Sequence, residues 1–362
     1  MKSFRGGLGE TFSKGAPKNK MKKETNTMNK TMNAAVLHAV GDLRYEAVAM
    51  PERRPGEVLM KVMACGVCGS DLPRVFEKGT YHFPTIPGHE FAGLIVESDK
   101  PELVGRRAAV FPLLPCRKCA ACEVGEYVNC SDYDYYGSRR DGGFAEYIAV
   151  DERNLVLTPD SLSFACASLC EPGSVARAAV RRMDVRLGDT AVVYGAGPIG
   201  LIAAQWARVA GAGKVRVVDI SDEKLAFAAK FGFEAYDEAR DGKADCVLEG
   251  TGVSPALNNA ILALKSHGRL VLMGNPARDM TINQSTYSQV LRKEILMRGT
   301  WNSSYNQVIN DWSATVEAMS SGLVKYEELI THRYPISRTL EALEMMRDRK
   351  EFYTKVTIVN EN

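Results

Sequence analysis

The sequence predicts an α/β protein of two domains, one built on a doubly wound parallel sheet and the other rich in β-strands. The chain has 362 residues, which is more than a single hydrophobic core usually serves. Its second half alternates apolar strand-like runs with helical patterns, starting from a glycine-rich turn. Residues 32–170 instead contain short strand-like runs separated by glycine and proline. The composition, 45% hydrophobic and 25% charged, is that of a globular protein.

The first 31 residues differ from the rest of the chain. They hold eight Lys or Arg residues against two acids and lack the apolar run of a secretory signal. We expect a disordered basic tail over 1–31, or a segment upstream of a true start at Met21, Met28 or Met32. A nucleic-acid-binding arm is the alternative, but no recognisable nucleic-acid-binding motif accompanies the charges, so we expect no nucleic-acid partner. No run of 18 apolar residues occurs, so no membrane span is expected.

The β-rich region begins with the runs "AAVLHA", "LRYEAVAM" and "EVLMKVM", and "AGLIVES" follows after residue 91. The third run continues into "MACGVCGSDLPR", residues 63–74, where two cysteines stand three positions apart. This pair could bind a metal, form a redox pair or lie in the core. Alternation along "LMKVMACGV" places Cys65 on a strand, so we expect it to be a core cysteine. The role of Cys68 is left open by spacing alone.

A second group of cysteines occurs in "PCRKCAACEVGEYVNC" and consists of Cys116, Cys119, Cys122 and Cys130. Nine cysteines without a signal peptide indicate a reducing, cytoplasmic compartment, where clustered thiols bind metal more often than they pair. Four thiolates at this spacing can close a tetrahedron around one zinc ion and leave no open position. We therefore predict a structural zinc site. An iron–sulfur cluster is the rival, but the long last spacing fits ferredoxin motifs poorly.

The glycine-rich turn lies in "DTAVVYGAGPIGLIAAQWARVAGAGKVRVVDISDEKL". A buried strand, Ala191–Tyr194, leads into the turn; a helix follows it, and then a second strand over Val215–Val218. This is the dinucleotide fingerprint in its full context, although enzymes of S-adenosylmethionine share a looser version. An acid after the second strand can accept from both ribose hydroxyls and would repel a 2′-phosphate, so we expect NAD rather than NADP. The predicted cofactor-binding residues are Gly195, Gly197, Pro198, Ile199, Gly200 and Asp219.

Taken together, the motifs resemble a known family. The order "GVCGSD", "PGHEFAG", the four-cysteine lobe, "CEPGSVA" and the glycine turn is similar to that of zinc-dependent medium-chain dehydrogenases, in particular their polyol dehydrogenase branch, over residues 32–362. The resemblance implies a GroES-like catalytic domain over 32–173 and 301–362 and a Rossmann cofactor domain over 174–300. It also implies a zinc- and NAD-dependent oxidoreductase that forms a homodimer or homotetramer.

The same resemblance assigns the residues of a catalytic zinc site. It implies Cys68 and His89 as ligands, with Glu90 and Glu171 as the carboxylates, of which either one could be the direct ligand. Cys170 is a weaker alternative to Glu171. Ser70 resembles the hydroxyl that takes the alcohol proton. Two positions depart from the family pattern, because Pro73 and Ala178 stand where relatives often have histidine; Pro73 cannot relay a proton.

The resemblance also implies a substrate, a sugar alcohol phosphate of the galactitol 1-phosphate type that is oxidised to a ketose phosphate. Arginine pairs well with phosphate, and Arg139 and Arg140 in "GSRRDGG", with Arg74 as a weaker candidate, are the predicted phosphate contacts. Asn302 is the predicted contact for a substrate hydroxyl. A free polyol of the sorbitol or iditol type is the runner-up substrate. A threonine-type dehydrogenase and a non-enzymatic binding protein are weaker alternatives.

Overall fold

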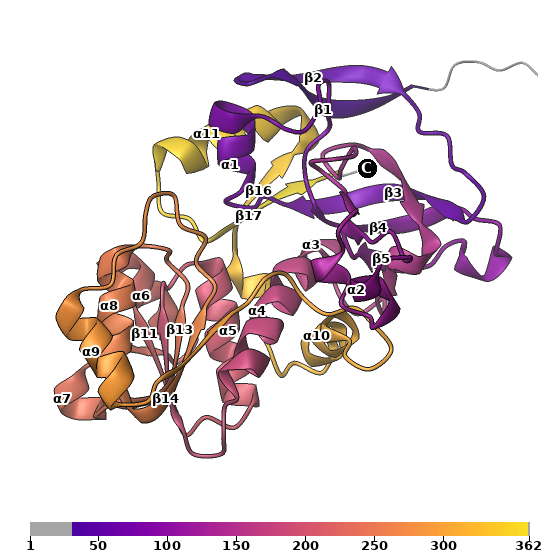
Figure 1. The fold of residues 1–362 in the computed structure, drawn as a ribbon. Coiled ribbons are helices and arrows are strands. Elements are labelled where there is room, and N and C mark those ends of the chain that lie inside the picture. The colour runs from indigo at the N-terminus through magenta and orange to yellow at the C-terminus, as the bar shows by residue number, and fades with distance from the viewer. Residues whose placement is uncertain (1–30, 361–362) are drawn as a thin grey trace, which may run out of the picture.

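The structure of the protein, a computed structural model, describes residues 31–360 and has two large sheets in two parts of the molecule (Figure 1). The predicted basic tail lies outside the described residues except for Thr31, where the first strand begins. Within the described part of the chain, no helix is both long and apolar enough to cross a membrane.

The first large sheet has six parallel strands in the order β12-β11-β10-β13-β14-β15. These strands span Glu234–Ala235, Lys214–Val218, Thr190–Tyr194, Ala244–Glu249, Leu264–Leu272 and Leu296–Gly299, respectively. The helices that connect them are α5 (Pro198–Val209), α6 (Asp222–Ala229), α7 (Glu238–Asp241), α8 (Ser254–Ala263) and α9 (Gln284–Arg292). The predicted strand–turn–helix–strand unit is thus β10, α5 and β11. The helix begins at Pro198 as predicted, and each strand begins one residue earlier than predicted.

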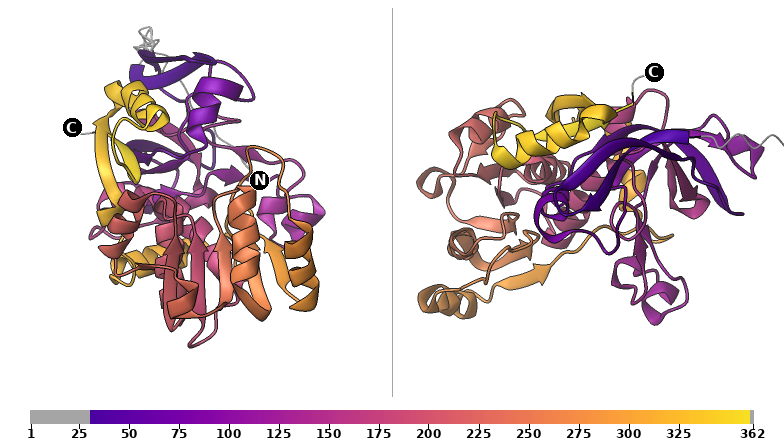
Figure 2. Two further views of the ribbon diagram at one scale, coloured as in Figure 1. Left: turned by 90° about the vertical axis from the view of Figure 1, so that its left-hand side faces the viewer. Right: turned by 90° about the horizontal axis from the view of Figure 1, so that it is seen from above.

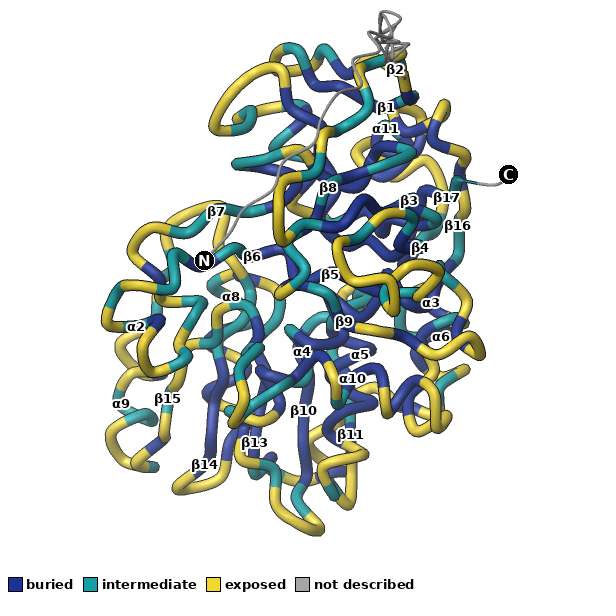
Figure 3. The backbone as a smooth tube through the Cα atoms, turned by 90° about the vertical axis from the view of Figure 1, so that its right-hand side faces the viewer, coloured by how far each residue is buried: buried dark blue, intermediate teal, exposed yellow. Residues whose placement is uncertain are grey.

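Both faces of this sheet are covered, as a doubly wound fold requires. Alternate side chains of β10 enter different cores: Ala191 and Val193 pack in the core that includes α5, whereas Val192 and Tyr194 pack in the core that includes α8. The central strands are accordingly buried along their length (Figure 3). The predicted parallel sheet is confirmed.

The second large sheet is mostly antiparallel, in the order β16-β17-β3-β4-β5-β9, and β8 also pairs with β3. In chain order, β3 to β5 span Glu57–Gly66, Glu90–Glu97 and Arg107–Val110, and β8 and β9 span Tyr147–Asp151 and Leu155–Leu157. The last two strands, β16 (Ile330–Pro335) and β17 (Lys355–Val359), come from the C-terminal end of the chain and are drawn in yellow beside the indigo segments (Figure 2). Two small antiparallel sheets complete the β structure: the hairpin β1–β2 (Thr31–Ala39 and Asp42–Ala49), and β6 with β7 (Leu113–Leu114 and Asp134–Tyr135), which the cysteine lobe separates along the chain.

Helix α4 (Cys170–Met183) lies between the two sheets (Figure 1). It packs against α5, α10 (Asp311–Ser320) and strands of both sheets, so one hydrophobic core includes Ala92 of β4 together with Val193 of β10. The remaining helices are α1 (Asp71–Pro73, continued by a π-turn over Arg74–Lys78), α2 (Ala120–Glu123), α3 (Phe164–Ser168) and α11 (Thr339–Asp348). The first turn of α4 therefore lies where the two sheets meet.

Candidate functional site

The glycine turn between β10 and α5 has the geometry of a dinucleotide-binding turn. Gly195 has a φ of 100°, which favours glycine. A Cβ at Gly200 would lie 1.8 Å from the carbonyl oxygen of Gly195, so α5 can approach the strand only with glycine there. A Cβ at Gly197, in contrast, would meet nothing within 4 Å, which leaves open space beside the helix N-terminus at Pro198 and Ile199. Such an N-terminus with free N–H groups suits a phosphate.

Asp219 follows β11 and lies beside this turn. Its carboxylate accepts hydrogen bonds from the backbone N–H of Ala196 (2.8 Å) and of Ser221 (3.0 Å), and the Lys224 ammonium is 3.6 Å away. The carboxylate is thereby held against the glycine turn, at the place where a bound dinucleotide would present its adenosine ribose. Ile220 beside it is fully exposed, which provides an apolar surface at the same edge.

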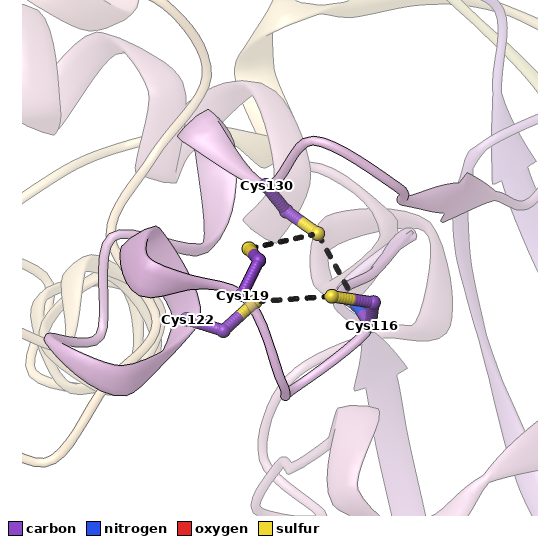
Figure 4. Close-up of side chains that lie close together, drawn as sticks. All are labelled: Cys116, Cys119, Cys122 and Cys130. Atoms are coloured by element: carbon purple, nitrogen blue, oxygen red, sulfur yellow. Dashed lines mark hydrogen bonds between the residues drawn. The ribbon is translucent and has the colours of Figure 1, made fainter.

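The four cysteines of the lobe point toward one another (Figure 4). The Sγ atoms of Cys116 and Cys122 are 4.0 Å apart, and those of Cys119 and Cys130 are 3.9 Å apart. A tetrahedron with zinc–sulfur bonds of about 2.3 Å has edges of about 3.8 Å, so the donors fit a zinc ion. N–H groups of Ser131 and Cys122 lower the pKa of the Cys119 thiol to about 6, which favours the thiolate that a metal requires.

We expect Cys119→Ser to destabilise the protein more than it impairs turnover. A metal that joins the two ends of the lobe acts as a cross-link, and losing such a staple typically costs about 2–5 kcal/mol. Thermal unfolding, zinc content and the kcat of the folded fraction would be measured together. Ala120→Ser, an exposed change in the same lobe, is the matched control. Unchanged melting together with lost activity would contradict a structural role.

A second group of metal-ligating side chains lies where β3 and β4 pair. Cys68 follows the last residue of β3 by two positions, and His89 directly precedes β4. Because Gly66 pairs with Glu90 in the antiparallel register, Cys68, His89 and Glu90 come together, with ligand atoms within 4.8 Å of one another. Thiol, imidazole and carboxylate are a donor set that zinc accepts.

The surroundings of this group favour a cation. Buried carboxylates of Asp71, Glu90 and Glu171 gather around His89, and the cations among them are Lys355 and Arg74. Burial lowers the pKa of His89, but Asp71 and Cys68 together raise it well above its ordinary value. The Nδ1 atom of His89 is buried 3.5 Å from Asp71 and has no well-formed hydrogen bond. The site thus fits a bound metal ion.

Glu171 lies in the first turn of α4, beside but outside the set that Cys68, His89 and Glu90 form. The pKa of Glu171 is raised to about 7, mainly by burial. His89 partly opposes this increase, and the nearby Glu90 carboxylate adds to it. Cys170, the alternative ligand, points elsewhere, because its thiol contacts the Ser174 hydroxyl and the carbonyl of Trp312. Cys65 is buried on β3, as its strand position predicts.

Two residues of this site were missed by sequence reasoning. Asp71 accepts the backbone N–H of Cys68 (2.9 Å) and the Arg74 guanidinium (2.8 Å) while facing His89. Lys355 lies 3% exposed on β17; its ammonium contacts the carboxylate of Glu90 and donates to the carbonyl of Val67 (3.0 Å). The signal for Lys355 was a lone charge at the start of the otherwise uncharged strand "KVTIV".

The predicted substrate residues lie in different surroundings. Arg140 faces the carboxylates of Asp134 (3.4 Å) and Glu57 (3.9 Å). Arg139 lies over the rings of Tyr81 and Tyr133. Asn302 has a φ of 54°, and its side-chain oxygen accepts from the backbone N–H of Ser303 (2.8 Å). Ser70 is exposed before α1 and makes no capping hydrogen bond.

Comparison with known proteins agrees with this architecture. Residues 54–160 match the alcohol dehydrogenase GroES-like domain family, and residues 198–321 match the zinc-binding dehydrogenase family. The chain belongs to the zinc-binding dehydrogenases and is an oxidoreductase, and its β-rich part is GroES-like. It is 34% identical over 320 residues to galactitol 1-phosphate 5-dehydrogenase of Escherichia coli (strain K12), covering 83% of this chain and 92% of that protein.

Two further relatives support the same branch. Sorbitol dehydrogenase of Bacillus subtilis (strain 168) is 33% identical, with 92% of this chain and 99% of that protein covered. The crystal structure of galactitol-1-phosphate dehydrogenase from Escherichia coli matches with a TM-score of 0.84 and 32% identity, covering 91% of this chain and 100% of that one. The predicted fold class and the resemblance to polyol dehydrogenases are therefore confirmed.

Proposed function

We propose that this dehydrogenase oxidises a secondary hydroxyl of a sugar alcohol phosphate, of the galactitol 1-phosphate type, to a ketose phosphate with NAD as hydride acceptor. The observation that carries the proposal is the convergence of Cys68, His89 and Glu90 where β3 meets β4. The likeness to galactitol 1-phosphate 5-dehydrogenase supports the substrate class. The protein is further proposed to be a cytoplasmic homodimer or homotetramer, in keeping with nine unpaired cysteines.

Two zinc ions per chain are part of this proposal. Cys116, Cys119, Cys122 and Cys130 would hold the structural ion, and Cys68 and His89 with Glu90 or Glu171 the catalytic one. The catalytic zinc, when bound, supplies Lewis acidity to the substrate hydroxyl. Asp71 orients the ligands, since it accepts the N–H of Cys68 and faces His89.

The proton route follows from the position of Ser70. Its hydroxyl caps no helix and is exposed, so a proton received from the substrate alcohol can pass directly to water. A histidine at the position of Pro73 is then not needed. Lys355 meanwhile pairs with Glu90 and holds its carboxylate toward β17.

The cofactor proposal predicts the effect of Asp219→Ala. Loss of a charged hydrogen bond of about 1.5–3 kcal/mol should raise the KM for NAD roughly 10- to 150-fold. The loss of the carboxylate should also narrow the preference for NAD over NADP. Steady-state kinetics with both cofactors would measure this, with the exposed neighbour Asp222→Ala as control. A wild-type enzyme that already prefers NADP would overturn the cofactor assignment.

The domain division proposed from the sequence, 32–173 with 301–362 and a cofactor domain over 174–300, has support in the sheets. The C-terminal strands β16 and β17 pair beside β3, and β15 ends at Gly299. Each proposed domain thus has one large sheet of its own, and the site lies at the first turn of α4 between them.

A substrate panel tests the function most directly. Galactitol 1-phosphate, galactitol, sorbitol and threonine would each be offered with NAD, and NADH formation followed by absorbance. We expect galactitol 1-phosphate to have the highest kcat/KM. A free polyol is the second candidate, because the sorbitol dehydrogenase relative is of nearly equal identity. Preference for sorbitol or galactitol would replace the main proposal with that one.

A further inference from the structure

Three arginines near the site differ in their partners. Arg74 pairs with Asp71, and Arg140 faces Asp134 and Glu57. Within residues 31–360, Arg139 has no carboxylate oxygen within 4.0 Å. A guanidinium already paired with carboxylates is largely neutralised, whereas an unpaired one keeps its donors and charge for a ligand. Arg139 is thus the arginine of the three that is free to bind an anion.

Two aromatic rings position the Arg139 guanidinium. Its central carbon lies 4.1 Å from the ring centroid of Tyr81 and 4.5 Å from that of Tyr133. These cation–π contacts hold the guanidinium between the two rings without neutralising its charge. The imidazole Nε2 of His82 also donates to the Arg139 carbonyl (3.1 Å), which ties the loop backbone to the segment that carries Tyr81. A side chain held in advance loses less conformational entropy on binding.

This guanidinium lines a cavity of about 500 Å³. Lys118 lines the same cavity as a second cation; it is exposed and forms no ion pair within the described part of the chain. Two carboxylates and Cys116 of the lobe line it as well. Asp134 faces Arg140, and Asp132 is exposed, as Lys118 is, so water and salt screen both of these charges. Arg139 is therefore the unpaired cation of this cavity that two rings hold in place.

The loop that carries Arg139 is linked to the candidate metal centre through Tyr135. The backbone N–H of Arg139 donates to the carbonyl of Tyr135 (3.0 Å), the last residue of β7. The ring of Tyr135 is 5.8 Å from that of His89. Burial raises the pKa of Tyr135 well above its ordinary value, and Glu171 and Cys68 raise it further. Tyr135 thus contacts the Arg139 loop through its backbone and faces His89 with its ring.

We propose that Arg139, held by Tyr81 and Tyr133 and assisted by Lys118, is the subsite that receives the phosphate of the substrate. This assignment rests on the proposed function. It gives the phosphate contact to Arg139 alone, whereas the sequence predicted both Arg139 and Arg140 as phosphate contacts. Arg140 instead holds the loop to Asp134 and Glu57.

The test compares Arg139→Ala with its neighbour Arg140→Ala on galactitol 1-phosphate and on galactitol. Arg139→Ala should raise the KM for the phosphate substrate about 10- to 150-fold, as expected for a lost charged hydrogen bond, and leave the galactitol rate nearly unchanged. Arg140→Ala keeps the Arg139 guanidinium but frees the Asp134 carboxylate, so it should raise the KM for the phosphate substrate clearly less than Arg139→Ala does. Lys118→Ala should raise the KM for the phosphate substrate severalfold, because a lysine binds phosphate as a point charge.

A calorimetric titration with galactitol 1-phosphate gives a readout independent of turnover, and the Arg139→Ala protein should show the same fold loss in affinity. Equal effects of Arg139→Ala on both substrates, or a larger effect of Arg140→Ala, would overturn the subsite while leaving the function in place. A wild-type enzyme that binds galactitol as tightly as its phosphate would overturn the proposed substrate as well. The two failures are therefore distinguishable in the same experiment.

Discussion

Replacing Cys68 by serine is expected to lower kcat/KM on the order of 100-fold or more. Removing even an outer partner of a metal ligand typically costs about 10–100-fold, and Cys68 is the only thiol in the group with His89 and Glu90 within the described residues. A hydroxyl at this position is a neutral, harder donor that binds zinc far less well than a thiolate. NADH formation measures the loss.

The control for this experiment is the neighbouring thiol. Cys65 is buried on β3 with no ligating partner among the described side chains, so Cys65→Ala should leave turnover nearly intact. Zinc analysis should find one ion fewer per chain in Cys68→Ser, and circular dichroism should find the fold unchanged. A Cys68→Ser enzyme that keeps more than about a tenth of the wild-type rate would show that Cys68 does not hold the metal.

Lys355→Met is expected to destabilise the protein by about 3–5 kcal/mol, the usual effect of removing one partner of a buried ion pair. Lys355 and Glu90 are 3% and 1% exposed, and Glu171 is a second acid near Glu90. In the zinc-free protein that lacks the ammonium, the Glu90 carboxylate would stay buried and uncompensated. Denaturant unfolding of the zinc-free proteins, monitored by fluorescence, would give the change in free energy.

Two further variants make this prediction specific. The double variant Lys355→Met with Glu90→Gln removes both charges and should recover part of the lost stability, since the two effects are coupled. The surface pair Lys265 and Asp245 is the matched control: it is 2.8 Å apart, but Lys265 is 48% exposed, so Lys265→Met should change stability by no more than about 1 kcal/mol. Equal losses in the two lysine variants would mean that burial of the Glu90 pair has no energetic consequence.

Local patterns predicted the parts of the fold that depend on short stretches of chain. The run Ala191–Tyr194, the glycine turn and the helix at Pro198 were readable because each rests on residues adjacent in sequence: apolar side chains for a buried strand, glycine for a close approach, and proline for a helix start. The cysteine lobe is likewise local, since its four residues lie between positions 116 and 130. The resemblance to polyol dehydrogenases also rested on contiguous motifs.

Contacts between distant segments could not be predicted in the same way. Lys355 reaches Glu90 only because β17 pairs with β3, and β3 pairs with β4. The different surroundings of Arg139 and Arg140, which are adjacent in sequence, arise from Tyr81 on one side and Glu57 on the other. Which partner each arginine meets depends on how three segments that are distant in sequence pack together.

From short-range periodicity and spacing, the sequence by itself thus determined the two-part α/β architecture and the glycine turn and predicted the cysteine lobe, whereas the catalytic metal group was implied only by the resemblance to a family. The tertiary structure alone decided how the charges around those residues are compensated. Asp71 supports Cys68 and faces His89, Lys355 neutralises Glu90, and Arg139 is left without a carboxylate. The physical reason is that an ion pair or a cation–π contact acts over a few ångströms in space, whereas sequence patterns report only on neighbours along the chain.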